Sequence, residues 1–399
     1  MSDAPPPTRR GLPRSIWALG FVSLLMDVSS EAIHSLLPVF MATVLGASML
    51  TIGLLEGAAE ATALIIKVFS GALSDWMGRR KPLALLGYGL GALSKPLFAI
   101  AGGMGLIVTA RLLDRVGKGI RGAPRDALVA DIAPPGMRGA AFGLRQSLDT
   151  VGAFLGPLFA MGLMLLWAND FRAVFWAASV PAVLCVAMLA WGVKEPERAP
   201  GARRVNPISR ANLQRLNNAY WWVVAIGAVF TLARFSEAFL VLRAQQGGLP
   251  LAATPLVLIA LNLVFSAGAY PLGKLSDSVS HTKLLVAGLV ALIAADGLLA
   301  FSNQGLVFWS GVALWGLHMA LTQGLLATMV ANAAPADLRG TAYGMFNLVC
   351  GMAMLVASAL AGWLWDQMGA PATFVAGMVF GALSLVGLLW RSRHPTRAL

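Results

Sequence analysis

Residues 71–83 read GALSDWMGRRKPL, and residues 273–285 read GKLSDSVSHTKLL. The two stretches share Gly, Leu, Ser and Asp at the same spacing, and each has a later Lys. Two more pairs of segments match at a similar offset: PPGMRGAAFGL (134–144) with APADLRGTAYGM (334–345), and SSEA (29–32) with FSEA (235–238). Because all three offsets are about 200 residues, half the chain, the sequence predicts two copies of one unit.

Charged residues are scarce along the whole chain. They make up 12% of the 399 residues, against 58% apolar residues, and the mean hydropathy is +0.73. A soluble globular protein carries about 25% charged residues. This composition excludes a water-soluble enzyme and a disordered chain, and it predicts an all-α polytopic membrane protein.

Long apolar runs alternate with short polar loops. A membrane helix needs about 20 mostly apolar residues, and windows of that length predict twelve spans. These begin near Ile16, Leu50, Pro82, Gly105, Gly139, Arg172, Tyr220, Ala252, Lys283, Gly305, Gly340 and Pro371.

The half-chain repeat divides these spans into two six-helix bundles. We expect a tail over residues 1–15, a bundle over 16–193, a linker over 194–219, a bundle over 220–391 and a tail over 392–399. Parallel repeats of this kind are typical of transporters that bind their substrate at the midplane between the halves.

Basic residues are concentrated in one set of loops, which predicts the orientation. One side has Arg9, Arg10, Arg14, Arg79, Arg80, Lys81, Arg138, the linker cations, Lys274, Lys283, Arg339 and the last arginines. The other side has little more than Arg172 and Arg243. Both termini and the linker are therefore expected in the cytoplasm of a bacterial inner membrane. The net charge of +12 follows from this bias and not from a nucleic-acid surface, because the cations are scattered over short loops.

The segment that begins at Gly71 resembles the loop signature of the major facilitator superfamily, G-x-x-x-D-R-x-G-R-[RK]. The matching residues are Gly71, Asp75, Gly78, Arg79 and Arg80, and Lys81 continues the basic run. Trp76 stands where the family usually has Arg. The second copy keeps Gly273, Asp277 and Lys283. The resemblance covers almost the whole chain and implies twelve helices, alternating access and a monomer that transports a small molecule.

A second, partial resemblance is to the motif associated with antiporters in this family. Its G-x-x-x-G-P core matches Gly152, Gly156 and Pro157 in the fifth span, but Ala160 and Met161 replace the small pair expected after it. The match favours export in exchange for protons.

The loop signature is expected to act as a gate at the cytoplasmic face. Asp75 is suited to a helix N-terminus or to an Arg of a neighbouring span, either of which favours one arrangement of the bundles. The basic run after it can hold acidic groups or lipid headgroups. The alternative is that these residues only set the topology, although that role would not require Gly71, Asp75 and Gly78 at fixed spacing.

Ionisable residues also fall inside the predicted spans, where each costs about 3 kcal/mol at the bilayer centre and is a functional hypothesis by default. The candidates for proton coupling and for the central cavity are Asp27, Glu31, Glu56, Glu60, Asp114, Arg115, Asp149, Arg234 and Glu237. The fourth span is the richest in charge. The resemblance implies that the first, fourth and seventh spans line the cavity.

Two readings of these charges remain open. Carboxylates four residues apart, as in Asp27/Glu31 and Glu56/Glu60, repel each other when both are ionised, which favours proton binding to one of them. The other reading is neutralisation, either within a helix, as for Arg145 with Asp149 and Arg234 with Glu237, or between helices through Arg115 or Arg145. Central arginines would suit an anionic or zwitterionic substrate, and dominant carboxylates a cationic one.

No cofactor, metal or nucleotide site is predicted. VGKGIRGAP (116–124) lacks the first glycine of a phosphate loop and lies within a helix. His34, His281 and His394 have no partner at metal-ligand spacing, and no nucleophile and base suggest an enzyme. The leading hypothesis is a proton-coupled exporter of a small organic solute. The alternatives are an importer of an organic anion or metal chelate, and a non-transporting sensor or lipid-handling protein.

Overall fold

A computed structural model describes residues 12–134, 137–196, 214–275, 278–335 and 338–393. Within these ranges the chain is helical, with turns and short loops and no strand. The first residue of each predicted span lies within two residues of the first residue of an observed helix or, for the eighth span, of a 3-10 turn. The all-α fold in two bundles is confirmed, while the predicted domain boundaries stay predictions, and residues 197–213 of the linker lie outside the described ranges.

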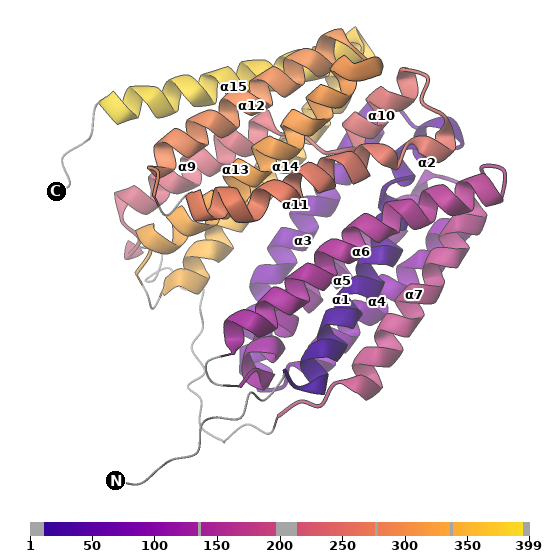
Figure 1. Cartoon of the computed structure of the whole chain (residues 1–399), viewed down its shortest axis with the longest axis vertical. Helices are drawn as coiled ribbons and strands as arrows, with labels where there is room; N and C mark the ends of the chain where they lie inside the picture. Colours follow the sequence, from indigo (N-terminus) through magenta and orange to yellow (C-terminus); the bar gives the residue numbers. More distant parts are fainter. Residues whose placement is uncertain (1–11, 135–136, 197–213, 276–277, 336–337, 394–399) are drawn as a thin grey trace.

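The helices form two bundles that run side by side (Figure 1). The first bundle holds α1 (Arg14–His34), α2 (Leu37–Thr43), α3 (Met49–Met77), α4 (Lys81–Ile100), α5 (Met104–Ile132), α6 (Arg138–Leu166) and α7 (Phe171–Gly192). The second holds α9 (Asn218–Ala233), α10 (Ala238–Gln246), a 3-10 turn (Leu251–Ala253), α11 (Leu256–Leu275), α12 (His281–Phe301), α13 (Gly305–Ala333), α14 (Arg339–Met368) and α15 (Ala370–Arg393).

Eleven spans in the described residues are long and apolar enough to cross a membrane, and α5 is the twelfth predicted span. α5 has 29 residues, the length of α3, but it carries too many charges to be recognised by hydropathy. It packs between α3 and α4, and Arg111, Asp114 and Arg115 are buried there. A charged helix is compatible with a membrane when its charges face other helices and not lipid.

The two bundles share one hydrophobic core at the end where α2 and α10 lie, which we call the α2–α10 end. Phe40 and Phe175 of the first bundle and Phe239 and Trp365 of the second belong to this single cluster. At the opposite end, which we call the terminal end, each bundle has separate hydrophobic clusters. The bundles therefore share a core at one end and have separate cores at the other, although α3 and α14 still touch at Val68 and Gly344.

Helices α3 and α14 make the closest contact between the bundles. A Cβ on Gly57 would lie 2.7 Å from the Leu355 Cα, and Cβ atoms on Gly53 and Gly362 would collide with the carbonyl oxygens of Ser358 and Met49. Glycine at these positions lets the two backbones touch.

Asp366 joins the bundles at the same end. Its carboxylate, on α14, accepts hydrogen bonds from the backbone N–H groups of Met49 (3.0 Å) and Leu50 (2.8 Å), at the start of α3. An anion at a helix N-terminus satisfies free N–H groups and interacts favourably with the helix dipole. Asp170 does the same for α7 within one bundle, where it accepts from Arg172 and Ala173.

Asp366→Ala is expected to loosen the α2–α10 end, because it removes the cap that connects the bundles. The loss of about 1 kcal/mol of capping energy should make the Met49 and Leu50 amides exchange hydrogen about fivefold faster. Spin labels at the exposed residues Val44 and Gln304, one on each bundle, should report a new population at longer distance. Asp170→Ala is the matched control and should speed exchange only in α7. Equal label distances in both variants would show that Asp366 does not hold the bundles together.

Candidate functional site

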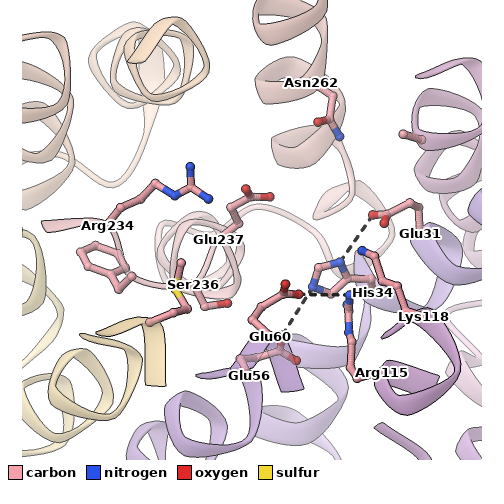
Figure 2. A pocket seen from close by; sticks show the side chains of 13 residues that line it. Glu31, His34, Glu56, Glu60, Arg115, Lys118, Arg234, Ser236, Glu237 and Asn262 are labelled. Atoms are coloured by element: carbon pink, nitrogen blue, oxygen red, sulfur yellow. Dashed lines mark ion pairs between the residues drawn. The ribbon is translucent and has the colours of Figure 1, made fainter. Parts of the chain in front are cut away.

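A cavity of about 220 Å³ lies where the two bundles meet (Figure 2). Its lining comes from α1, α3, α5 and α6 on one side and from the α9–α10 break, α11 and α14 on the other. The lining residues are Glu31, His34, Glu56, Glu60, Arg115, Lys118, Ala153, Arg234, Phe235, Ser236, Glu237, Asn262 and Met354. Seven of the thirteen are acidic or basic residues, and His34 is an eighth side chain that can carry a charge. The cavity is therefore strongly polar for a site between membrane helices.

Breaks in two helices contribute to this cavity. The first span is interrupted between α1, which ends at His34, and α2, which begins at Leu37. The seventh span is interrupted between Ala233 and Ala238, where Arg234 to Glu237 leave the helix. Helix ends leave backbone polar groups without intrahelical partners, so such breaks are tolerated where they face a cavity or protein.

His34 connects two carboxylates of the site. Its Nδ1 lies 3.4 Å from Glu31 Oε2, and its Nε2 lies 3.5 Å from Glu56 Oε2. Glu56 also accepts a hydrogen bond from Arg111 Nη2 at 2.5 Å. The sequence predicted only that His34 has no partner at metal-ligand spacing. It did not predict that His34 contacts two carboxylates. Its position three residues after Glu31, on the same helix face, was the available signal.

The other central charges pair mostly between helices. Arg115 Nη1 lies 3.1 Å from Glu60 Oε1, and Lys95 Nζ lies 2.7 Å from Asp114 Oδ1. Lys95 Nζ also donates to Ser30 Oγ at 3.0 Å. Of the two readings left open for Glu60, the structure has the interhelical pair with Arg115. Arg111 and Lys118 lie three residues before and four residues after Asp114, a spacing that suits pairing within α5, but neither forms an ion pair with Asp114 among the described residues.

Three charges that face the cavity have no ion-pair partner within 4 Å in the described ranges: Lys118 on α5, and Arg234 and Glu237 in the α9–α10 break. Figure 2 shows Lys118 on one side of the cavity and Arg234 on the other, with Glu237 beside Arg234. The pairing of Arg234 with Glu237 proposed from their spacing is thus absent as a close contact, because the break replaces the helical geometry that it requires.

Asp27 and Asp149 lie together beside the central site. Both line a neighbouring cavity of about 420 Å³. Asp149 is 3.5 Å from Arg145, the pair predicted within α6, and 3.7 Å from Arg125. Asp27 and Glu31 were predicted to form a doublet of carboxylates. In the structure they line different cavities, Glu31 the central one and Asp27 the neighbouring one.

The loop signature is anchored within its own bundle. Arg80 donates through Nη1 to Ser74 Oγ (2.8 Å), lies 3.5 Å from Asp131, and its backbone N–H donates to Glu195. Lys81 Nζ donates to the carbonyl oxygens of Ala190 and Val193, both at 2.7 Å, at the end of α7. Gly78 ends α3 with φ of +67°, a conformation that side chains disfavour.

The remaining residues of the loop signature and its second copy make fewer contacts in the described structure. Gly71 packs near Ala123, Arg79, Gly273 and Lys283 are exposed, and the Lys283 N–H donates to Ser280 Oγ at the start of α12. The Asp75 side chain and Asp277 lie outside what the structure describes. The gate role stays a prediction.

The antiporter-like residues form the contact between α6 and α1. A Cβ on Gly152 would lie 2.6 Å from the Leu24 carbonyl oxygen, and one on Gly156 would lie 2.8 Å from Glu31 Cβ. Pro157 is buried within α6. These glycines therefore let α6 pack directly behind Glu31, a consequence that the motif alone did not reveal.

Larger cavities lie nearer the terminal end, and the smaller of the two shares Glu60, Arg234 and Met354 with the central cavity. One of about 910 Å³ lies between α6, α11 and α13, and one of about 530 Å³ lies between α3, α9, α13 and α14. In the described residues, no group of three or more His, Cys, Asp or Glu side chains is arranged to hold a metal ion.

Comparison with known proteins gives consistent matches. The family described as the Major Facilitator Superfamily matches residues 19–358. An uncharacterized MFS-type transporter of Methanocaldococcus jannaschii is 32% identical over 391 residues, which cover 96% of each protein. Multidrug resistance protein MdtH of Yersinia pestis is 24% identical over 93% of this chain and 92% of that protein. A bacterial homologue of the human lysosomal transporter Spinster, solved inward-facing and unoccupied, has the same fold, with a TM-score of 0.76 at 17% identity over 96% of this chain and 98% of that one.

Lys95→Met is expected to destabilise the protein strongly, since it leaves the buried Asp114 without its closest cation. Removing one member of a buried ion pair costs about 3–5 kcal/mol, whereas replacing both members with apolar residues is often neutral. The variant Lys95→Met/Asp114→Leu should therefore recover most of the loss. The measurement is the temperature at which half of the purified protein remains monodisperse. A double variant as unstable as the single one would contradict the pairing.

Proposed function

The chain belongs to the major facilitator superfamily, and from this premise we propose that it is a proton-coupled secondary transporter that exports a small organic solute by alternating access. The observation that carries the proposal is the position of His34 between Glu31 and Glu56 on the wall of the central cavity. Histidine is the side chain whose charge changes most readily near neutral pH. Linked to carboxylates where the bundles meet, it provides a place for a proton that both bundles can influence.

We infer that the terminal end faces the cytoplasm of a bacterial inner membrane. The bias of the basic residues supports this orientation. The two exceptions at the α2–α10 end have structural roles: Arg172 donates to the Ala101 carbonyl oxygen after α4, and Arg243 donates to those of Leu299 and Ala300 near the end of α12. With this orientation, the joined α2–α10 end and the cavities toward the terminal end correspond to an inward-facing state.

Coupling would act through the ion pairs of the first bundle. When Glu60 is ionised it holds Arg115, and when Glu31 and Glu56 are ionised they hold His34 and Arg111. Protonation of a carboxylate removes the charge that the cation faces and weakens that pair, which changes the relative free energy of the two facings. A proton that enters from outside and leaves to the cytoplasm would then accompany outward movement of the solute.

Two observations favour export. Gly152 and Gly156 bring α6 against Glu31 through the antiporter-like motif, and one relative is a multidrug resistance protein. The second candidate is import of an organic anion with a proton. It is supported by Arg234, a cation in the cavity wall that has no ion-pair partner within 4 Å in the described residues.

The first experiment is a toxicity profile in a drug-sensitised bacterial host. The host would express the unmodified protein, Glu31→Gln/Glu60→Gln, or the control Asp170→Asn, whose membrane abundance is compared by immunoblot. We expect resistance to some compounds with the unmodified protein and the control, and its loss in the double variant, because the proton-exchanging carboxylates are gone. Increased sensitivity with the unmodified protein would support the import candidate.

Proton coupling itself is measured in everted membrane vesicles with a compound found in that profile. Adding the compound should partly discharge an imposed pH gradient with the unmodified protein but not with Glu31→Gln/Glu60→Gln. The same discharge in a triple variant, Asp27→Asn/Glu31→Gln/Glu60→Gln, would overturn the coupling proposal.

A further inference from the structure

The charges around the central cavity do not balance once their pairs are counted. Glu56 is taken up by Arg111 and His34, Glu31 by His34, and Glu60 by Arg115. What remains are two cations, Lys118 and Arg234, and one anion, Glu237. When His34 is protonated and neutralises Glu31, the unpaired part of the site carries a net positive charge.

The two remaining cations belong to different bundles. Lys118 projects from α5, and Arg234 ends α9 at the break in the seventh span, on the opposite side of the cavity in Figure 2. Arg115, which the sequence suggested for substrate binding, is 3% exposed and already paired. Lys118, by contrast, is exposed toward the cavity.

Closing the bundles around the site would bring Lys118 and Arg234 toward each other. Like charges in a desolvated space repel strongly, so closure without a ligand is costly. An anionic group between them would remove this repulsion and would contact both bundles at once. A cationic ligand would increase the repulsion, and among the described residues Glu237 is the one acid in the cavity lining that has no ion-pair partner and could attract it.

We propose that the transported solute is a small organic anion whose acid group is held between Lys118 and Arg234. This inference rests on the proposed transport function and adds the substrate class. Glu237 lies beside Arg234 and lowers its net attraction, which disfavours retention of the anion after the gate opens. The cavity has few apolar lining residues, chiefly Phe235, Met354 and Ala153, so the ligand is a compact polar acid and not a large apolar compound.

The electrostatic part of the proposal can be tested without knowing the substrate. Ala153 lines the central cavity, and Ala153→Cys in a Cys185→Ala/Cys350→Ala background places one thiol there. The purified full chain is treated with an anionic (sulfonatoethyl) or a cationic (trimethylammonioethyl) methanethiosulfonate reagent. The ratio of the two rates cancels the reactivity of the thiol, and it is normalised to the same ratio at exposed Gln304→Cys.

We expect the normalised ratio to favour the anionic reagent by about tenfold, the effect of a net unit charge near the thiol at intermediate dielectric. Lys118→Gln/Arg234→Gln should reverse the preference, and Glu237→Gln should increase it. Lys274→Gln removes an exposed cation at the terminal end of α11 and should leave the ratio unchanged. A ratio at or below one in the parent, or a ratio unaffected by Lys118→Gln/Arg234→Gln, would overturn the proposal.

This outcome is separable from that of the transport proposal. The reagent ratio does not require transport, so it can be positive even if proton coupling fails. Conversely, if the toxicity profile and the vesicle assay identify a cationic compound as the transported solute, transport stands and the anion proposal is wrong.

Discussion

Pairing of buried charges across helices is the constraint on which the rest of this structure depends. α5 carries the cations and acids that hydropathy would keep out of a membrane, and it is accommodated because Glu56 and Glu60 of α3 and Lys95 of α4 meet them. Each pair fixes the rotation of two helices about their axes, since a one-residue rotation would leave an ion in an apolar environment at a cost of several kcal/mol. The first bundle is therefore held in one arrangement by electrostatics, in addition to packing.

The second bundle and the contact between bundles follow a different principle. Glycines on α3 and α14, together with a shared aromatic core, join the bundles at the α2–α10 end, and Asp366 caps a helix of the other bundle there. Such contacts can separate with little desolvated charge left behind, which suits an interface that opens and closes. The unpaired charges of the central cavity lie next to this interface, where a ligand and the relative position of the bundles can influence each other.

Spacing along one helix predicted an ion pair where both partners stay on that helix, and it gave no information where the partner lies on another helix. The Arg145–Asp149 pair has the predicted i, i+4 geometry. Arg234 and Glu237 have a helical spacing too, but the helix breaks between Ala233 and Ala238, so that spacing does not describe their geometry. His34 was set aside as a metal ligand, although Glu31 stands three residues before it and Glu56 approaches it from α3. Lys118 was not among the predicted cavity residues, yet it lines the central cavity.

The sequence by itself determined the environment, the number of spans, the two-bundle repeat and the family. These depend on composition, on the length of apolar runs and on local motifs, all of which are properties of contiguous residues. Only the tertiary structure decided which charges pair with one another and which cavity charges have no ion-pair partner within the described residues. Whether Arg115 or Lys118 is available depends on where Glu60 lies in space, and that is fixed by the packing of α3 against α5.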